Sequence, residues 1–171
     1  NNKHFSTLSG AEQFTFNLAT ITSLGCISNT TKSPILAIDE GFSCLDNKHL
    51  NEIVSVIREF RPDYIVNFSA QGMVAQSWGN PGQWFQTNSM ALMSLADQLK
   101  QESYLKRFVQ ISTPEVYGSC AGHIKEDAPL NPSTPYAASK ASGDSSLIPF
   151  YKNYNFPVVF TRATNVYGAH Q

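Results

Sequence analysis

The sequence has few of the features that mark membrane, zinc-binding and nucleic-acid-binding proteins. None of its apolar runs approaches the roughly 18 residues of a membrane span, and its first residues lack a signal-peptide pattern. Its 3 cysteines are widely spaced and do not combine with the 4 histidines at zinc-binding spacing. The formal net charge is −1 and the basic residues are dispersed, which gives no electrostatic footprint for nucleic acid. We therefore expect a cytoplasmic protein with no membrane partner and no clear nucleic-acid footprint.

Length and composition predict one α/β domain over residues 1–171. The chain is 42% hydrophobic, which is enough to bury a sizeable core. Helical patterns alternate with four apolar segments that are typical of buried strands, at 34–38, 63–69, 107–112 and 157–162. Such alternation favours parallel strands with helices on both faces. The predicted fold is a three-layer sandwich with a mainly parallel, Rossmann-like sheet.

Two polar stretches are predicted to be loops. Residues 71–86 are turn-rich and aromatic, which suits a loop over a cofactor or substrate pocket or, alternatively, a surface loop whose tryptophans cover the sheet. Residues 119–135 contain three prolines whose fixed φ angles stiffen the segment. Pro135 precedes Tyr136, as suits the start of a helix.

Tyr136 and Lys140 form the strongest chemical pattern in the chain. Residues four apart share a helix face, so the Lys140 ammonium can lie beside the Tyr136 phenol. A phenol with a pKa of about 10 is a poor acid–base group near neutral pH, and a nearby positive charge favours its ionised form. The pair therefore predicts a tyrosine that transfers a proton. The same spacing also arises by chance in helices, so the surrounding residues decide its meaning.

Several motifs surround that pair. They are Asn67-Phe68-Ser69-Ala70-Gln71, Thr87-Asn88, Ser112-Thr113-Pro114-Glu115-Val116-Tyr117-Gly118, Pro132-Ser133-Thr134-Pro135-Tyr136 and Thr161-Arg162-Ala163-Thr164-Asn165-Val166-Tyr167-Gly168. With them, residues from about 59 to 171 resemble the later half of an extended short-chain dehydrogenase/reductase, specifically the nucleotide-sugar 4,6-dehydratases and epimerases.

The resemblance implies NAD or NADP as cofactor and a nucleotide sugar as substrate. In such enzymes the nicotinamide takes a hydride from C4 of the sugar while the tyrosine takes the hydroxyl proton. Tyr136 would be that base, Lys140 would tune it, and Thr113 would hydrogen-bond the sugar oxygen. Ser69 and Ala70, together with Tyr136 and Lys140, would contact the cofactor.

Two further positions follow from the same resemblance. Glu115 matches the residue with which dehydratases abstract the C5 proton, and Asn165 would contact the nucleotide sugar. Dehydratases usually carry an aspartic acid just before that glutamate, to protonate the departing hydroxyl, and here the position is Pro114. Because proline has no proton to give, epimerisation or simple binding is favoured over dehydration.

The first third of the chain resembles a different family. Ser9 and Gly10 precede a helical pattern, and the apolar segment 35–38 ends in Asp39 and Glu40, with Asp46 shortly after. Residues 5–57 thereby resemble the C-terminal ATPase lobe of the ABC superfamily, closest to chromosome-maintenance and DNA-break-repair ATPases.

That second resemblance assigns a role to each of these residues. Ser9 and Gly10 would belong to the signature loop, and Asp46 to a dimer-contacting loop. Asp39 would hold magnesium weakly, and Glu40 would activate the attacking water. The alternative is an ordinary strand that ends in a helix-capping acid.

Neither resemblance includes its phosphate-binding turn. The sequence contains neither Gly-x-x-Gly-x-x-Gly nor Gly-x-x-x-x-Gly-Lys-Ser/Thr. We therefore expect a chimera joined in the helix at 47–60, or else one diverged domain. The expected function is an incomplete dehydratase/epimerase-like domain with little or no turnover. The alternatives are an active epimerase or dehydratase whose cofactor site a partner or homo-oligomer completes, and an ATPase segment acting in trans.

Overall fold

A computed structural model describes residues 34–39, 47–164 and 168. These residues contain a four-stranded sheet with the strand order β1-β2-β3-β4, in which all three neighbouring pairs are parallel. The strands are Ile35–Ile38 (β1), Tyr64–Asn67 (β2), Arg107–Ile111 (β3) and Val158–Thr161 (β4). The predicted Rossmann-like α/β sheet is confirmed. β1 pairs with β2 in the register Ile35 to Tyr64, so the strand that ends in Asp39 belongs to the same sheet as the others.

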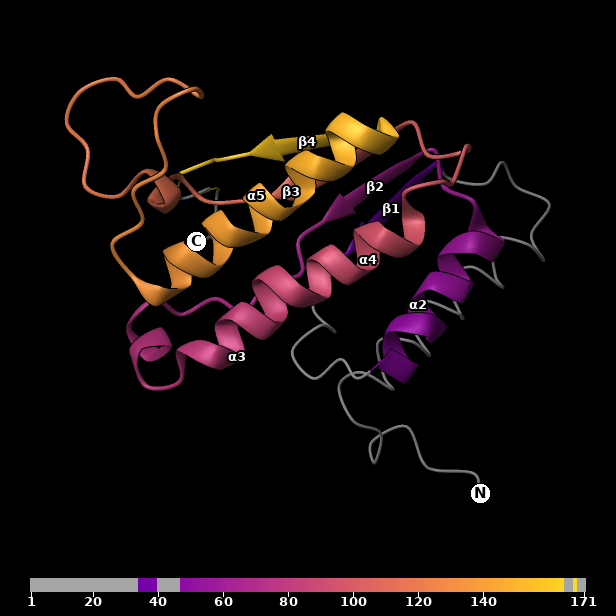
Figure 1. Cartoon of the computed structure of the whole chain (residues 1–171), viewed down its shortest axis with the longest axis horizontal. Coiled ribbons are helices and arrows are strands. Elements are labelled where there is room, and N and C mark those ends of the chain that lie inside the picture. The colour runs from indigo at the N-terminus through magenta and orange to yellow at the C-terminus, as the bar shows by residue number, and fades with distance from the viewer. Residues whose placement is uncertain (1–33, 40–46, 165–167, 169–171) are drawn as a thin grey trace.

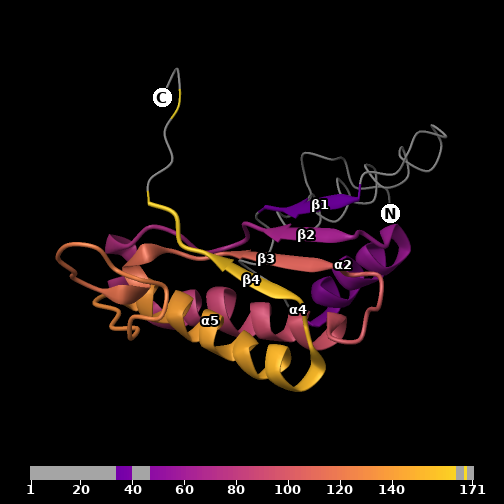
Figure 2. The same cartoon turned by 90° about the horizontal axis from the view of Figure 1, so that it is seen from above.

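The long helices pack on one face of this sheet (Figures 1 and 2). The helical segments are Asn47–Phe60 (α2), Ala75–Trp78 (η2), Pro81–Phe85 (α3), Gln86–Ala91 (η3), Leu92–Leu99 (α4), Pro114–Tyr117 (η4) and Pro135–Tyr154 (α5). A single apolar core joins α2, α4 and α5 to alternate residues of the strands. Its most deeply buried members include Ile38, Ile53, Ile65, Leu95, Phe108 and Leu147. Removing such side chains from water is the main stabilising contribution to the fold.

The opposite face of the sheet is open over much of its area. Tyr64, Phe68 and Val159 point to this face and are 39%, 48% and 40% exposed. In β2 such residues alternate with the buried Ile65 and Asn67, as side chains on opposite faces of a pleated sheet must. Within the ranges 34–39 and 47–164, no helix covers this face, so the third layer of the sandwich stays a prediction.

The segment 71–86 is more regular than a loop. It contains η2 and α3, and it leads without a break into a π-helical stretch, η3. Trp84 is buried and its indole Nε1 donates to the carbonyl of Gly72 at 2.6 Å, whereas Trp78 is 65% exposed. The loop prediction was wrong here because contacts with the rest of the fold, which local composition does not reveal, hold short helices together.

The π-helical stretch meets α5 at very close range. A Cβ atom at Gly143 would lie 2.3 Å from the carbonyl oxygen of Asn88, so only glycine permits this approach. The buried Asn88 amide bonds both the N–H and the carbonyl of Gln71, at 2.7 and 3.0 Å, and also the Ser139 hydroxyl at 2.9 Å. These contacts fix α5 against the segment that follows β2.

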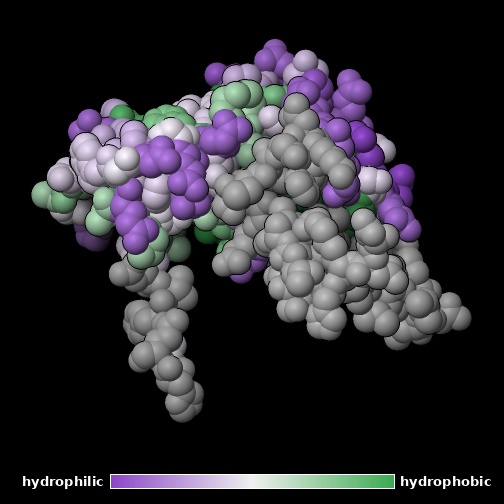
Figure 3. Space-filling model, turned by 90° about the horizontal axis from the view of Figure 1, so that it is seen from below, coloured by the Kyte–Doolittle hydropathy of each residue, from purple (hydrophilic) through white to green (hydrophobic). Residues whose placement is uncertain are grey.

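The outer surface of the described part is mixed in polarity. In the view from below, hydrophilic and hydrophobic residues are interspersed over the area coloured by hydropathy (Figure 3). Among the helices of the described ranges, none is long and apolar enough to cross a membrane.

Candidate active site

A pocket opens where β3 and β4 end. Its volume is about 340 Å³, and the residues that line it come from the end of β3, from η4, from the start of α5 and from the segment after β4. They are Ile111, Ser112, Thr113, Pro114, Glu115, Tyr136, Ala163 and Thr164. The carboxyl ends of parallel strands are the usual place for ligand sites in open α/β sheets. The structure thus brings three of the predicted site residues, Thr113, Glu115 and Tyr136, to one pocket.

Tyr136 reaches the pocket from the first turn of α5. Thr134 caps this helix, because its hydroxyl accepts from the backbone N–H of Ala137 at 3.1 Å. The backbone N–H of Tyr136 donates to the buried Ser77 hydroxyl at 3.1 Å, which ties the helix start to η2. The Tyr136 side chain lines the same pocket as Thr113, and the Thr113 hydroxyl is close enough to affect its pKa. The backbone of Tyr136 is therefore held by the cap of its own helix and by η2.

The ionisation of Tyr136 differs from the expectation. Burial raises the pKa of Tyr136 above its ordinary value, the hydrogen bond with Thr113 lowers it, and the charge of Glu115 raises it. The net direction is upward, so this structure does not show the lowering by Lys140 that the spacing predicted. The physical reason is that the ammonium of Lys140 is directed at a backbone carbonyl.

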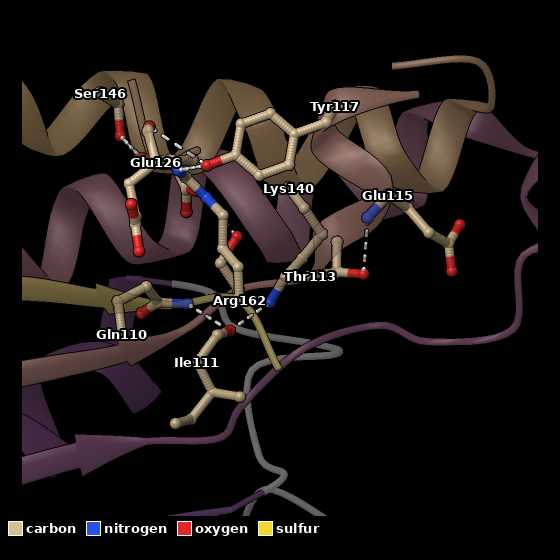
Figure 4. A network of polar contacts seen from close by, with 12 residues as sticks. Gln110, Ile111, Thr113, Glu115, Tyr117, Glu126, Lys140, Ser146 and Arg162 are labelled. Atoms are coloured by element: carbon tan, nitrogen blue, oxygen red, sulfur yellow. Dashed lines mark hydrogen bonds and ion pairs between the residues drawn. The ribbon is translucent and has the colours of Figure 1, made fainter. Parts of the chain in front are cut away.

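Lys140 lies beneath the pocket. It is 4% exposed, and its Nζ donates to the carbonyl oxygen of Ile111 at 2.7 Å (Figure 4). The side-chain amide of Gln110 donates to the same carbonyl at 3.2 Å and accepts from the amide of Asn67 at 2.7 Å. Burial lowers the pKa of Lys140 to about 8, against an opposing effect of the Asp144 charge. An ammonium has three donors, and the carbonyl of Ile111 takes one.

Thr113 and Glu115 are placed by the short helix η4. Thr113 is buried, and its hydroxyl accepts from the backbone N–H of Glu115 at 3.3 Å, as an N-cap residue does. The Glu115 side chain is exposed at the pocket. Pro114 occupies the first helical position, where its missing N–H matters least.

Sequence reasoning missed two residues of this region, Asp144 and Arg162. Asp144 lies one helical turn beyond Lys140, is 2% exposed, and pairs with Arg162 at 3.0 Å. The signal was present, since Tyr136, Lys140 and Asp144 follow one another at intervals of four on a helix face. The partner was not predictable, because Arg162 joins α5 only through the position of β4.

The remaining predicted residues lie elsewhere. Ser69 and Ala70 do not line the pocket, and the buried Ser69 hydroxyl donates to the carbonyl of Ile38 at 3.3 Å. Their contact with a cofactor stays a prediction. Asp39 is exposed at the end of β1. Over the described ranges, no group of three or more His, Cys, Asp or Glu side chains could hold a metal ion. The predicted roles of Ser9, Gly10, Glu40, Asp46 and Asn165 fall outside the described residues.

The cap of α5 gives a first prediction. Replacing Thr134 with alanine removes the acceptor for the backbone N–H of Ala137. We expect the free energy of unfolding to fall by about 1 kcal/mol. Urea denaturation followed by circular dichroism measures this change, and the exposed neighbour Ser133 provides the control, with an expected effect of Ser133→Ala below about 0.5 kcal/mol. Equal effects of the two substitutions would refute the cap.

Comparison with known proteins decides the family. Residues 10–171 match the family described as GDP-mannose 4,6 dehydratase. The chain belongs to this family. The GDP-mannose 4,6 dehydratase match agrees with the resemblance of residues 59–171 to nucleotide-sugar enzymes of the short-chain dehydrogenase/reductase type, and it extends this likeness toward the N-terminus.

The individual proteins compared with this chain by sequence and structure are nucleotide-sugar enzymes. A dTDP-glucose 4,6-dehydratase of Streptomyces niveus is 41% identical over 110 residues, which are 64% of this chain and 32% of that protein. The crystal structure of a dTDP-glucose 4,6-dehydratase from Streptomyces venezuelae, with NAD and TYD bound, matches with a TM-score of 0.66 and 27% identity over 95% of this chain and 56% of that one. A UDP-glucuronic acid 4-epimerase from Bacillus cereus, in complex with UDP-glucuronic acid and NAD, matches with a TM-score of 0.63 and 31% identity, over 70% of this chain and 37% of that one.

The extent of these matches bears on the predicted chimera. The chain spans about a third of the length of the Streptomyces niveus relative. The family match begins at residue 10 and so includes most of the segment 5–57 that resembles an ATPase lobe. The matches give no support to an ATPase segment or to bound magnesium, and the junction near 47–60 stays a prediction.

Proposed function

We propose that this chain carries the proton-transferring half of an NAD(P)-dependent nucleotide-sugar site. One observation supports this most strongly: Tyr136, Thr113 and Glu115 line one pocket at the carboxyl ends of β3 and β4. Tyr136 exchanges a proton with a sugar hydroxyl, and Thr113 holds the oxygen that bears this proton. With its raised pKa the phenol is the proton donor when a C4 carbonyl is reduced, and it takes a proton only in its ionised form. General acid–base catalysis needs such groups within hydrogen-bond reach of the reacting atom.

The hydrogen-bond donors of the Lys140 ammonium fit the ribose of a nicotinamide cofactor. One of its three donors is used by Ile111, which leaves two for ribose hydroxyl groups. When bound, NAD or NADP supplies the acceptor for the hydride. The pyrophosphate side has no matching glycine-rich turn in this sequence. We therefore propose that the chain alone binds the cofactor weakly and shows little or no turnover.

The residues of the pocket favour C4 chemistry over dehydration. Glu115 is available to take a C5 proton, but its neighbour Pro114 cannot protonate a leaving hydroxyl. Oxidation and reduction at C4, as in an epimerase, requires only the tyrosine and the cofactor. The proposed reaction is therefore reversible hydride removal at C4 of a nucleotide sugar, and full activity requires a complete cofactor site.

Titration calorimetry with NAD, NADP and ATP tests the proposal, together with an activity assay on a panel of nucleotide sugars. Three missing charge-assisted hydrogen bonds weaken cofactor binding by roughly a thousandfold or more. We expect no micromolar binding and no turnover for the chain alone. The matched variants are Lys140→Ala in the site and Lys152→Ala on the exposed part of the same helix. Micromolar affinity for NAD that only Lys140→Ala removes would contradict the predicted inactivity and show that the site assembles without the glycine-rich turn.

An ATPase-like segment that acts in trans is the second candidate. The observation that favours it is the placement of Asp39, which is exposed at the carboxyl end of the parallel strand β1. Magnesium sites need oxygen ligands at such a crevice. The ATP arm of the calorimetry tests this candidate, and Asp39→Asn is the variant that should remove any magnesium-dependent heat.

A further inference from the structure

Asp144 is the centre of a buried ionic junction beneath the pocket. Its Oδ2 accepts from the Ser112 hydroxyl at 2.8 Å, and from Arg162 through Nη2 at 3.0 Å and Nε at 3.3 Å. The Arg162 side chain is 19% exposed and the Asp144 side chain is 2% exposed. A buried carboxylate requires partners of this kind, because an unpaired charge in the interior is strongly unfavourable. The junction therefore connects α5 with the ends of both β3 and β4.

The other side of Arg162 extends this junction toward the segment 119–134. Its Nη1 donates to the hydroxyl of Tyr117 at 2.6 Å, and its guanidinium lies 5.0 Å from the centre of the Tyr117 ring (Figure 4). The Tyr117 hydroxyl in turn donates to the backbone carbonyl of Glu126 at 3.2 Å. The planar guanidinium has several donors in a fixed arrangement, so it can hold both partners at once.

These contacts surround the pocket without entering it. Arg162 is followed directly by Ala163 and Thr164, which line the pocket, and Ser112 lines it as well. Neither Asp144 nor Arg162 is a lining residue. The charged groups of the junction therefore act on the walls of the pocket and not on its contents.

We propose that Asp144 and Arg162 are positioning residues. Their ion pair holds the segment 162–164 and the loop 119–134 against α5. It also keeps the Lys140 ammonium within hydrogen-bond distance of the Ile111 carbonyl. The proposal rests on the proposed function, because it concerns the shape of the same pocket. Asp144 and Lys140 are neighbours on one helix face, so the carboxylate also favours the charged form of the lysine. The junction sets the separation between the wall that carries Thr164 and the helix that carries Tyr136.

Four variants distinguish this role from that of an ordinary stabilising ion pair. Asp144→Asn removes the charge at nearly constant shape, and Arg162→Lys keeps the charge but loses the fork that binds two partners. Tyr117→Phe cuts only the connection to the loop. Glu102→Gln is the control, because it breaks an ion pair with Arg58 at 2.7 Å that is much more exposed than the Asp144 pair.

NMR of the ¹⁵N-labelled full chain gives two readouts that do not depend on cofactor binding. The first is amide exchange, which we expect to rise at least about tenfold for Asp144→Asn and Arg162→Lys at Ser112, whose N–H donates to the carbonyl of Thr161, and at Ala128 and Asn131 in the loop. This is the effect of losing one hydrogen bond to a charged group. Tyr117→Phe is expected to raise exchange in 119–134 only. The second readout is the titration of the Lys140 amine, assigned with Lys140→Arg, whose midpoint moves to lower pH in Asp144→Asn and not in Arg162→Lys.

Two results would overturn the proposal. One is a uniform rise of exchange across the sheet, as expected of a merely stabilising pair, and the other is an unchanged Lys140 midpoint in Asp144→Asn. If Asp144→Asn does not fold, the contrast between Arg162→Lys and Tyr117→Phe still decides the matter. Because neither readout involves NAD, failure of the calorimetric prediction is distinguishable from failure of this one.

Discussion

Replacing Gly118 with alanine is expected to lower the free energy of unfolding by about 3–5 kcal/mol. Gly118 ends η4 with φ 74° and ψ −153°, a conformation that is essentially restricted to glycine. A Cβ atom there would also lie 2.0 Å from the carbonyl oxygen of Asn131. The new methyl group would have to displace backbone, because Asn131 is itself held by a bond from its N–H to the carbonyl of Val116 at 2.9 Å.

The matched control for this substitution is Gly122→Ala. Gly122 has the same φ of 74°, but nothing lies within 4 Å of its added Cβ. It is therefore expected to lose only about 1–2 kcal/mol, from the left-handed backbone alone. Urea denaturation of both variants measures the difference, which reports the overlap with Asn131 together with the backbone conformation that ψ of Gly118 imposes. Losses of equal size would show that the close approach of Gly118 to Asn131 does not exist in solution.

Replacing Lys140 with methionine is expected to change the pH dependence of stability. Burial lowers the pKa of Lys140 from its ordinary value of 10.5 to about 8. The unfolded chain therefore binds more protons than the folded chain between these values, so stability rises with pH in this window and falls as pH decreases toward 8. The full effect of such a shift is about 3 kcal/mol. Methionine removes the ionisable group and with it this contribution.

The measurement is the free energy of unfolding of wild type and variant at pH 7.5 and pH 10. The free energy of unfolding of Lys140→Met minus that of wild type is expected to be about 2–3 kcal/mol larger at pH 7.5 than at pH 10. Lys152→Met, at an exposed position of the same helix, should show no such difference between the two pH values. Parallel behaviour of the two variants would mean that the Lys140 amine is solvated in the folded state.

Much of the fold was predictable because it depends on local periodicity. The four apolar segments became strands within one or two residues of their predicted bounds, and the helix expected at 47–60 is α2, which buries Leu50, Ile53, Val54 and Ile57 in the core. Such patterns report which side of an element faces the core. The short helices at 75–78 and 81–85 were not predictable in this way, because the bonds from Tyr136 to Ser77 and from Asn88 to Ser139 depend on a distant segment of the chain.

The residues of the candidate site were predictable only where the place of each one follows from its own strand end or helix start. Tyr136 and Thr113 meet as the motifs implied, since each lies at a fixed place next to a strand end or helix start. The direction of the Lys140 ammonium was not predictable, because it depends on the free carbonyl of Ile111 at the end of β3. The same limit applies to Arg162, whose partner on α5 is determined by the order of the strands.

The order of the strands also determines how the chain can be divided. Within the described residues, each strand is hydrogen-bonded only to the strands that directly precede and follow it, so no later strand is inserted between two earlier ones. Among these strands β1 is an edge strand bonded to β2 alone, so its removal would break only the pairing of β1 with β2 and would leave the pairing of β2, β3 and β4 unchanged.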